Sequence, residues 1–189
     1  MSGFLLHLLR HGAPEQPGLL MGRTDGPPCP TGIAACVEQV AEIPFAAIVT
    51  SDLGRASAAA QAIGAQRALP VTVDPRWREL DFGAWDGLAP AAIDNDAMGR
   101  FWNDPDACPP PQGERWSALT ARVSDALDTL PARDTLIVTH GGAIRAALAV
   151  LFGFDQRHLW AFDLPYGALL SLRVWPGTPR SAQIMGLWP

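Results

Sequence analysis

Two histidines in the sequence stand where apolar runs end. His11 follows Arg10 after the first run, and His140 precedes a glycine pair after a run far downstream. A third short run, 46–50, leads to Arg55. Ligands of α/β proteins bind in the crevice at the carboxyl ends of the strands, so these side chains are expected to meet there. Two arginines and two histidines in one place are suited to holding a phosphoryl group, because each donates hydrogen bonds to its oxygens.

The elements that must position these residues alternate between strand and helix. Apolar segments at 4–9, 46–50 and 135–139 predict buried strands, and each is followed by a helical pattern. Helices are expected from a cap at Thr31 to near Pro44, at 55–66, 114–130 and 142–152, with an irregular helical stretch at 89–102. Further strands are expected at 71–73, 169–175 and 183–188. This rhythm predicts one domain over residues 1–189, a three-layer α/β/α sandwich with a mostly parallel central sheet.

Composition and charge restrict the classes of partner. The 189 residues are 48% hydrophobic, and the net charge is -5. An acidic chain is a poor match for nucleic acid or an anionic membrane surface, and three cysteines without paired spacing predict neither a disulfide framework nor a metal site. The first apolar run is too short for a signal peptide or a membrane span. We therefore expect a cytoplasmic protein, and the sequence leaves a homo-oligomer open.

Four motifs, in this order along the chain, resemble those of the histidine phosphatase superfamily, the phosphoglycerate-mutase-like enzymes. They are Arg10-His11-Gly12, the segment Ser51–Ala60, the acidic segment Trp77–Gly83, and Val138–Arg145. One tripeptide alone would be a weak signal, but four motifs in family order are specific. The resemblance extends from Leu5 to about Leu151. It implies a phosphoglycerate-mutase-like fold and metal-independent hydrolysis of a small-molecule phosphate ester, without a cofactor.

The resemblance assigns the nucleophile to His11. A neutral imidazole nitrogen would attack phosphorus and form a phosphohistidine, which divides one difficult displacement into two easier ones. A backbone carbonyl is expected to hold the other ring nitrogen, and Gly12 allows the chain to turn close beside it. Arg10 and Arg55 would bind the phosphoryl oxygens in a bidentate manner.

The second histidine motif would complete this clamp. His140 is expected to be protonated beside a bound dianion, because the negative charge favours an imidazolium. Gly141 and Gly142 open a helix, whose first free N–H groups would point toward the anion.

The leaving oxygen needs a proton, and a carboxyl group close to bound phosphate can supply it. Glu79 and Asp81 are both candidates, because two residues apart in an extended segment they share a face. Only the resemblance favours Glu79.

Residues around the acidic segment bear on the choice between mutase and phosphatase. Mutases of this family carry an arginine and a tyrosine where this sequence has Leu80 and Phe82, so hydrolysis is expected. The segments 21–25, and 101–105 leading to 109–114, resemble α-ribazole phosphatases of cobalamin synthesis. The expected substrate is therefore α-ribazole 5′-phosphate.

Three further residues are candidate substrate contacts. Arg23 would be a third anion contact, and Trp85 and Trp102 would form the wall of a pocket for a flat aromatic base. The Pro109–Pro111 loop is either a surface connection or a lid, and the resemblance favours the lid. The alternatives are a broad-specificity phosphatase, a phosphoglycerate mutase, or a catalytically silent binder of phosphorylated ligands.

Overall fold

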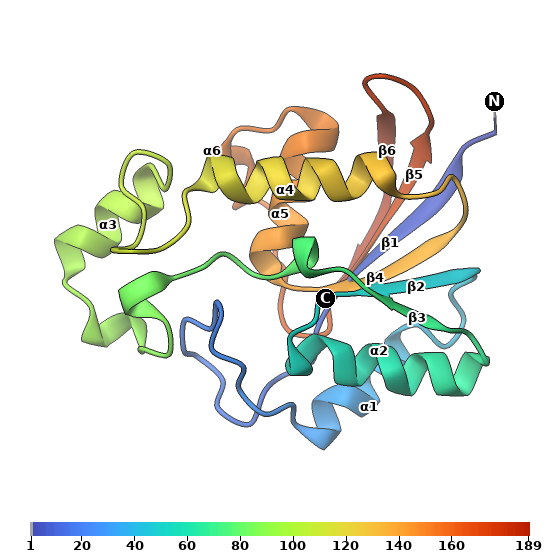
Figure 1. Cartoon of the computed structure of the whole chain (residues 1–189), viewed down its shortest axis with the longest axis horizontal. Helices are drawn as coiled ribbons and strands as arrows, with labels where there is room; N and C mark the ends of the chain where they lie inside the picture. Colours follow the sequence, from blue (N-terminus) through green and yellow to red (C-terminus); the bar gives the residue numbers. More distant parts are fainter. Residues whose placement is uncertain (1) are drawn as a thin grey trace.

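A six-stranded mixed sheet forms the centre of the structure, a computed structural model that describes residues 2–189 (Figure 1). In spatial order its strands are β3 (Val71–Val73), β2 (Ala47–Thr50), β4 (Thr135–Thr139), β1 (Phe4–Arg10), β5 (Leu169–Trp175) and β6 (Ser181–Trp188). The first four are parallel, whereas β5 runs antiparallel to β1 and β6 antiparallel to β5. The carboxyl ends of β1, β2 and β4 therefore meet at one edge.

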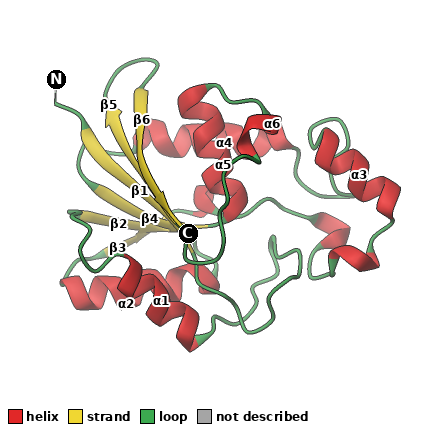
Figure 2. Ribbon diagram, turned by 180° about the vertical axis from the view of Figure 1, so that it is seen from behind, coloured by secondary structure: helices red, strands yellow, loops and turns green. Residues whose placement is uncertain are grey.

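Helices cover both faces of this sheet. Helices α1 (Pro30–Gln39) and α2 (Gly54–Arg67) lie on one face, and α4 (Trp116–Thr129) and α5 (Gly141–Phe152) lie on the other (Figures 1 and 2). This arrangement confirms the predicted α/β architecture with a mostly parallel sheet. Helix α3 (Asn95–Asn103) projects from the body of the molecule, and a short helix, α6 (Gln156–Leu159), follows α5. Within residues 2–189, every helix falls short of the length and apolar character that crossing a membrane requires.

Alternating side chains of the central strands pack against the two helical layers. Leu6 and Leu8 of β1 join Ile137 of β4 in the core beneath α4 and α5, while Leu9 and Val138 join the core beneath α1 and α2. All five are buried. Burying one such side chain stabilises the fold by about 1.5–3 kcal/mol, so the ends of β1 and β4 are held firmly on both faces.

Helix α1 begins earlier than the sequence pattern predicts. Cys29 occupies the N-cap position and Pro30 the first turn, so Thr31 is not the cap. Proline favours this first helical position because its fixed φ suits the helix and its missing N–H has no intrahelical partner there. The Thr31 hydroxyl instead lies 2.9 Å from the Cys29 sulfur.

The other two histidines, His7 and His158, lie outside the edge where His11 and His140 meet. His7, buried in β1, lies 2.7 Å through Nδ1 from the Ser171 hydroxyl and 3.2 Å through Nε2 from the Pro44 carbonyl. His158 is exposed on α6 beside Asp155.

Candidate active site

His11 lies immediately beyond β1, at the edge where the parallel strands end. Its backbone N–H donates to the Thr139 carbonyl of β4 at 2.9 Å, which fixes its position relative to the neighbouring strand. The ring Nδ1 lies 2.8 Å from the Gly12 carbonyl. Because a carbonyl can only accept, Nδ1 carries the proton and Nε2 keeps its lone pair. Burial, reinforced by the charge of Arg55, lowers the pKa of His11 to about 3, so the imidazole is neutral near pH 7.

Gly12 allows the loop after β1 to approach helix α1 closely. A Cβ atom on Gly12 would lie 2.0 Å from the Gly32 carbonyl oxygen, a separation that real side chains do not reach. Any larger residue would push the loop away from α1 and move the carbonyl that orients His11.

Arg55, in the first turn of α2, is a fully buried arginine. Its Nη1 donates to the Thr24 carbonyl at 2.9 Å, and its Nη2 donates to the carbonyls of Met21 and Gly22 at 2.6 and 2.9 Å. Only the buried Nε lacks a hydrogen-bond partner among residues 2–189. Arg55 therefore shapes the 21–24 loop with its terminal nitrogens and keeps Nε available.

Arg10 approaches the site from the last position of β1. Its Nη1 donates to the Leu164 carbonyl, and its guanidinium lies over the ring of Tyr166, 4.1 Å from the ring centroid. Stacking on an aromatic ring fixes the plane of the guanidinium group. The Nε atom is again buried and unpartnered within the described chain.

His140 is the N-cap residue of α5, directly after the last residue of β4, and it is completely buried. Its Nε2 lies 2.7 Å from the Ser51 hydroxyl, and its ring centroid is 5.1 Å from that of His11. Burial, with the charges of His11 and Arg55, lowers the pKa of His140 well below its ordinary value. These surroundings alone favour a neutral His140, whereas the imidazolium expected beside a bound dianion stays a prediction. If Ser51 donates to Nε2, the proton of His140 resides on Nδ1.

Three buried nitrogen atoms around His11 lack hydrogen-bond partners among residues 2–189. They are Nε of Arg10, Nε of Arg55 and Nδ1 of His140. A buried polar group without a partner costs roughly 1–3 kcal/mol, and more when it is charged. A tetrahedral oxyanion beside His11 could accept hydrogen bonds from all three, so this place is the candidate phosphoryl site.

The first residues of α5 interact with the acidic segment. The Gly142 N–H donates to Glu79 Oε2 at 3.0 Å, so it does not point freely toward an anion as the sequence predicted. A helix N-terminus leaves such N–H groups unsatisfied, and a nearby carboxylate satisfies one of them. Gly141 lies against two guanidinium groups, since a Cβ atom there would be 3.3 Å from Arg145 Nη1 and 3.6 Å from Arg10 Nε.

The two candidate acids have different surroundings. Glu79 lies in the wall of a cavity that Arg10 also lines, next to the start of α5. Asp81 accepts the Gly83 N–H at 2.9 Å and pairs with Arg23 Nε at 3.3 Å. Asp81 and Arg23 thus form an ion pair that no sequence pattern predicted.

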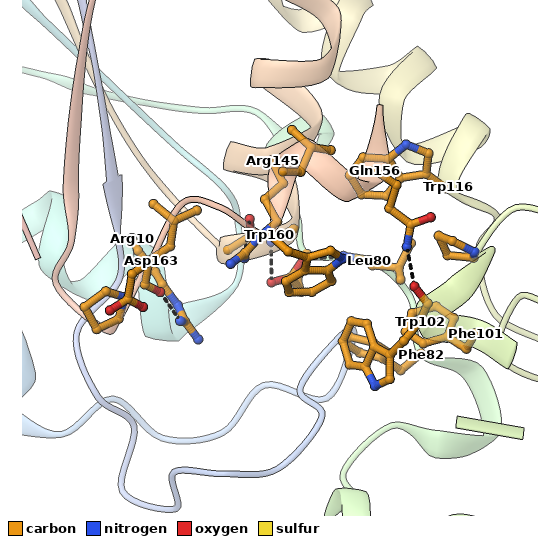
Figure 3. A pocket seen from close by; sticks show the side chains of 17 residues that line it. Arg10, Leu80, Phe82, Phe101, Trp102, Trp116, Arg145, Gln156, Trp160 and Asp163 are labelled. Carbon is orange, nitrogen blue, oxygen red and sulfur yellow. Dashed lines mark hydrogen bonds between the residues drawn. The ribbon is translucent and has the colours of Figure 1, made fainter. Parts of the chain in front are cut away.

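A cavity of about 350 Å³ opens beside the phosphoryl site (Figure 3). Five aromatic side chains contribute to its wall, namely Phe82, Phe101, Trp102, Trp116 and Trp160. Trp102 therefore lies where a pocket residue was expected, with its ring 4.8 Å from that of Trp160. Trp85 instead packs edge-on against Phe101 inside the core, at 5.7 Å.

The proline-rich loop packs beside the acidic segment. The Ala84 N–H donates to the Pro111 carbonyl at 2.8 Å, and a Cβ atom on Gly83 would lie 2.3 Å from the same oxygen. Pro105, at the start of this connection, contributes to the cavity wall. Pro109–Pro111 thus pack on the acidic segment, whereas Pro105 faces the cavity.

Arg145 is a cavity residue that was not singled out from the sequence. Its guanidinium lies 4.4 Å from the centroid of the Trp160 ring, and Nη2 donates to the Phe162 carbonyl at 3.2 Å. Its buried Nε has no partner among the described residues, and burial lowers the pKa of Arg145. The available signal was its spacing, because a residue four after Gly141 lies on the same helix face.

Nitrogen-15 NMR of histidine-labelled protein will check the protonation of the two site histidines. We expect His11 and His140 to remain neutral from pH 8 to pH 5, because burial lowers both pKa values and thus delays protonation on acidification. Both rings should carry their proton on Nδ1. Ser51→Ala should shift the tautomer equilibrium of His140 and leave His11 unchanged. An imidazolium signal from either ring at pH 6.5 would contradict this description.

Comparison with known proteins agrees with this geometry. Residues 6–185 match the histidine phosphatase superfamily, branch 1. The chain is 36% identical over 118 residues to glucosyl-3-phosphoglycerate phosphatase of Mycobacterium tuberculosis, a match that covers 55% of this chain and only about half, 53%, of that relative. It is 26% identical over 181 residues to adenosylcobalamin/alpha-ribazole phosphatase of Escherichia coli, covering 89% of each protein.

A solved structure of the mycobacterial glucosyl-3-phosphoglycerate phosphatase superposes on this chain with a TM-score of 0.85 and 26% identity, covering 97% of both chains. The family match includes most of β1, all of β2, β3 and β4, and both histidine motifs. This chain is therefore a member of the histidine phosphatase superfamily, branch 1.

Proposed function

We propose that this protein hydrolyses phosphomonoesters through a phosphohistidine on His11. The observation that carries this proposal is the group of unpartnered buried nitrogens of Arg10, Arg55 and His140 around a neutral histidine. Preorganised donors of this kind stabilise charge on a transferring phosphoryl group without reorganisation of solvent.

In the first step, His11 Nε2 attacks phosphorus while the bond from phosphorus to the ester oxygen breaks. The Gly12 carbonyl accepts a hydrogen bond from Nδ1–H throughout, which keeps the lone pair on Nε2. The departing oxygen takes a proton from Glu79, which together with Arg10 lines the cavity where the leaving group would be bound. Its position favours Glu79 over Asp81, because Asp81 is paired with Arg23.

In the second step, a water molecule attacks the phosphorylated histidine. The phosphorus–nitrogen bond breaks, Glu79 takes the proton from water, and inorganic phosphate leaves with His11 restored. Arg10, Arg55 and the Nδ1–H of His140 hold the phosphoryl oxygens through both steps. A neutral His140 suffices for this purpose, because it donates a hydrogen bond in its Nδ1–H tautomer.

The substrate that we propose is α-ribazole 5′-phosphate. A flat aromatic base fits a cavity walled by Phe82, Phe101 and tryptophans, where aromatic pairs gain about 0.5–1.5 kcal/mol beyond area burial. Similarity to a relative named for alpha-ribazole over 89% of both proteins supports the same choice.

Arg145 favours a second candidate, a phosphate ester that also carries a carboxylate, such as glucosyl-3-phosphoglycerate. Its guanidinium lines the cavity near Arg10, and neither has a carboxylate of the described chain within 4.0 Å. A carboxylate on the leaving group could accept from the unpartnered Nε of Arg145.

Steady-state kinetics on a panel of esters will test the function and separate the two substrates. We expect kcat/KM for α-ribazole 5′-phosphate to exceed that for 3-phosphoglycerate by roughly tenfold or more, with negligible mutase activity. Arg145→Leu should then leave the ribazole ester nearly unaffected. If glucosyl-3-phosphoglycerate is instead the best substrate, and Arg145→Leu lowers its kcat/KM roughly 10–100-fold, the second candidate is correct.

One control variant and one binding measurement complete the panel. Arg157→Leu removes an exposed arginine on α6 and should change neither ester. Folded protein that binds vanadate but hydrolyses no ester would support the catalytically silent alternative and refute the proposed function.

A further inference from the structure

Arg122 is a half-buried arginine of α4 that lies against the acidic segment and outside the proposed reaction. Its guanidinium nitrogens donate to the carbonyls of Arg76 at 2.7 Å, Arg78 at 2.8 Å and Glu79 at 2.8 Å, and to the Glu114 carboxylate at 2.8 and 2.9 Å. One side chain thus binds three carbonyls of a single short segment. The last of them belongs to the proposed proton donor.

The segment that Arg122 holds has little regular structure. After the short 3-10 helix Pro75–Trp77, residues 78–82 are neither helix nor strand, so no ladder of backbone hydrogen bonds fixes their conformation. Buried carbonyls without such a ladder need other donors. Arg122 supplies them from a helix that packs in the core beneath the segment.

Glu114, the ion-pair partner of Arg122, binds the main chain of Asp81, two residues after Glu79. Its backbone N–H donates to the Asp81 carbonyl at 2.9 Å, and its carboxylate accepts the Asp81 N–H at 3.3 Å. The side chains of Glu114 and Arg122 are only 11% and 17% exposed, so solvent screens their ion pair weakly. The pair therefore anchors the main chain on both sides of Glu79.

We infer that the Arg122–Glu114 pair positions the proton donor. The carboxylate of Glu79 is fixed by the first residues of α5, and its main chain is fixed by Arg122. The inference rests on the proposed role of Glu79 in hydrolysis. A displacement of a reacting group by about 1 Å costs roughly 10²-fold in rate, so loss of the anchor should weaken proton donation and leave the nucleophile intact.

Leaving-group dependence will reveal such a role. Protonation matters for an alkyl phosphate and little for p-nitrophenyl phosphate, whose leaving group is already acidic. We expect Arg122→Ala to lower kcat/KM for the alkyl ester roughly tenfold to 100-fold more than that for p-nitrophenyl phosphate, and Arg122→Lys to recover part of the difference. In the Glu79→Gln background, Arg122→Ala should add little, because both substitutions remove the same step.

Arg76→Ala is the matched control. Arg76 lies directly before the acidic segment and also contacts α4. It donates to the Asp125 carbonyl and the Thr129 hydroxyl at 2.9 Å each, but it does not bind the Glu79 carbonyl. The Arg76→Ala variant should have a lower melting temperature, and its kcat/KM should change by the same factor for both esters. If Arg122→Ala does not fold, Glu114→Gln keeps the shape of the pair, removes its charge, and should give the same selective loss.

The outcomes distinguish the two proposals. Equal losses on both esters for Arg122→Ala and Glu114→Gln, with a selective loss for Glu79→Gln, would overturn the positioning role alone. Equal losses for Glu79→Gln itself would overturn the proposed acid and the inference that rests on it.

Discussion

Replacing His11 by alanine is expected to abolish turnover and covalent labelling together. The variant removes the proposed nucleophile, Nε2 of a histidine that burial keeps neutral, so kcat/KM should fall by about 10⁴-fold or more. Wild-type protein mixed with ³²P-labelled ester and quenched without acid should carry a phosphoryl group that is stable in base and labile in acid. Denaturing electrophoresis at high pH will measure it.

His158→Ala is the matched control for this experiment, because it removes an exposed histidine on α6 and should keep both label and activity. Activity should also be unchanged in EDTA. A His11→Ala variant with near-wild-type activity would refute the phosphohistidine mechanism, as would activity that is lost on chelation and restored by a divalent ion.

Glu79→Gln is expected to separate good from poor leaving groups. The amide keeps the size of the side chain but supplies no acidic proton, so kcat/KM for an alkyl phosphate should fall by ~10²–10⁴-fold. Hydrolysis of p-nitrophenyl phosphate should be nearly spared. Parallel initial-rate measurements on the two esters will give the ratio directly.

Asp81→Asn provides the comparison for the acid. Asp81 pairs with Arg23, so its replacement should disturb the 21–24 loop but leave the ratio between the two esters unchanged. A selective loss of the alkyl ester in Asp81→Asn, and not in Glu79→Gln, would transfer the acid role to Asp81.

The candidate phosphoryl site could be predicted because its residues follow apolar runs that predict buried strands. Arg10, His11 and His140 all lie at ends of buried parallel strands, and Arg55 follows another, so the sheet alone brings them to one edge. Residue types then specify the chemistry. Their catalytic roles remain predictions that the kinetics above will check.

Contacts between loops could not be predicted in the same way. Trp85 and Trp102 were both predicted to line the pocket, yet Trp85 is buried against Phe101 and Trp102 lines the cavity. Tyr166 reaches Arg10 only through the fold of an irregular segment before β5. Such placements depend on tertiary packing, which no local period encodes.

The missing side chain at Gly142 makes the acid and the phosphate clamp a single mechanical unit. A Cβ atom there would lie 2.1 Å from Glu79 Oε1, so Glu79 rests directly on the residue two after His140. Any movement of the start of α5 carries both groups together and preserves their spacing. The cavity walls contributed by Phe101, Trp102 and Trp160 come from segments outside this unit. Substitutions in those walls can therefore change the leaving group that the cavity accepts without displacing Glu79 from Gly142.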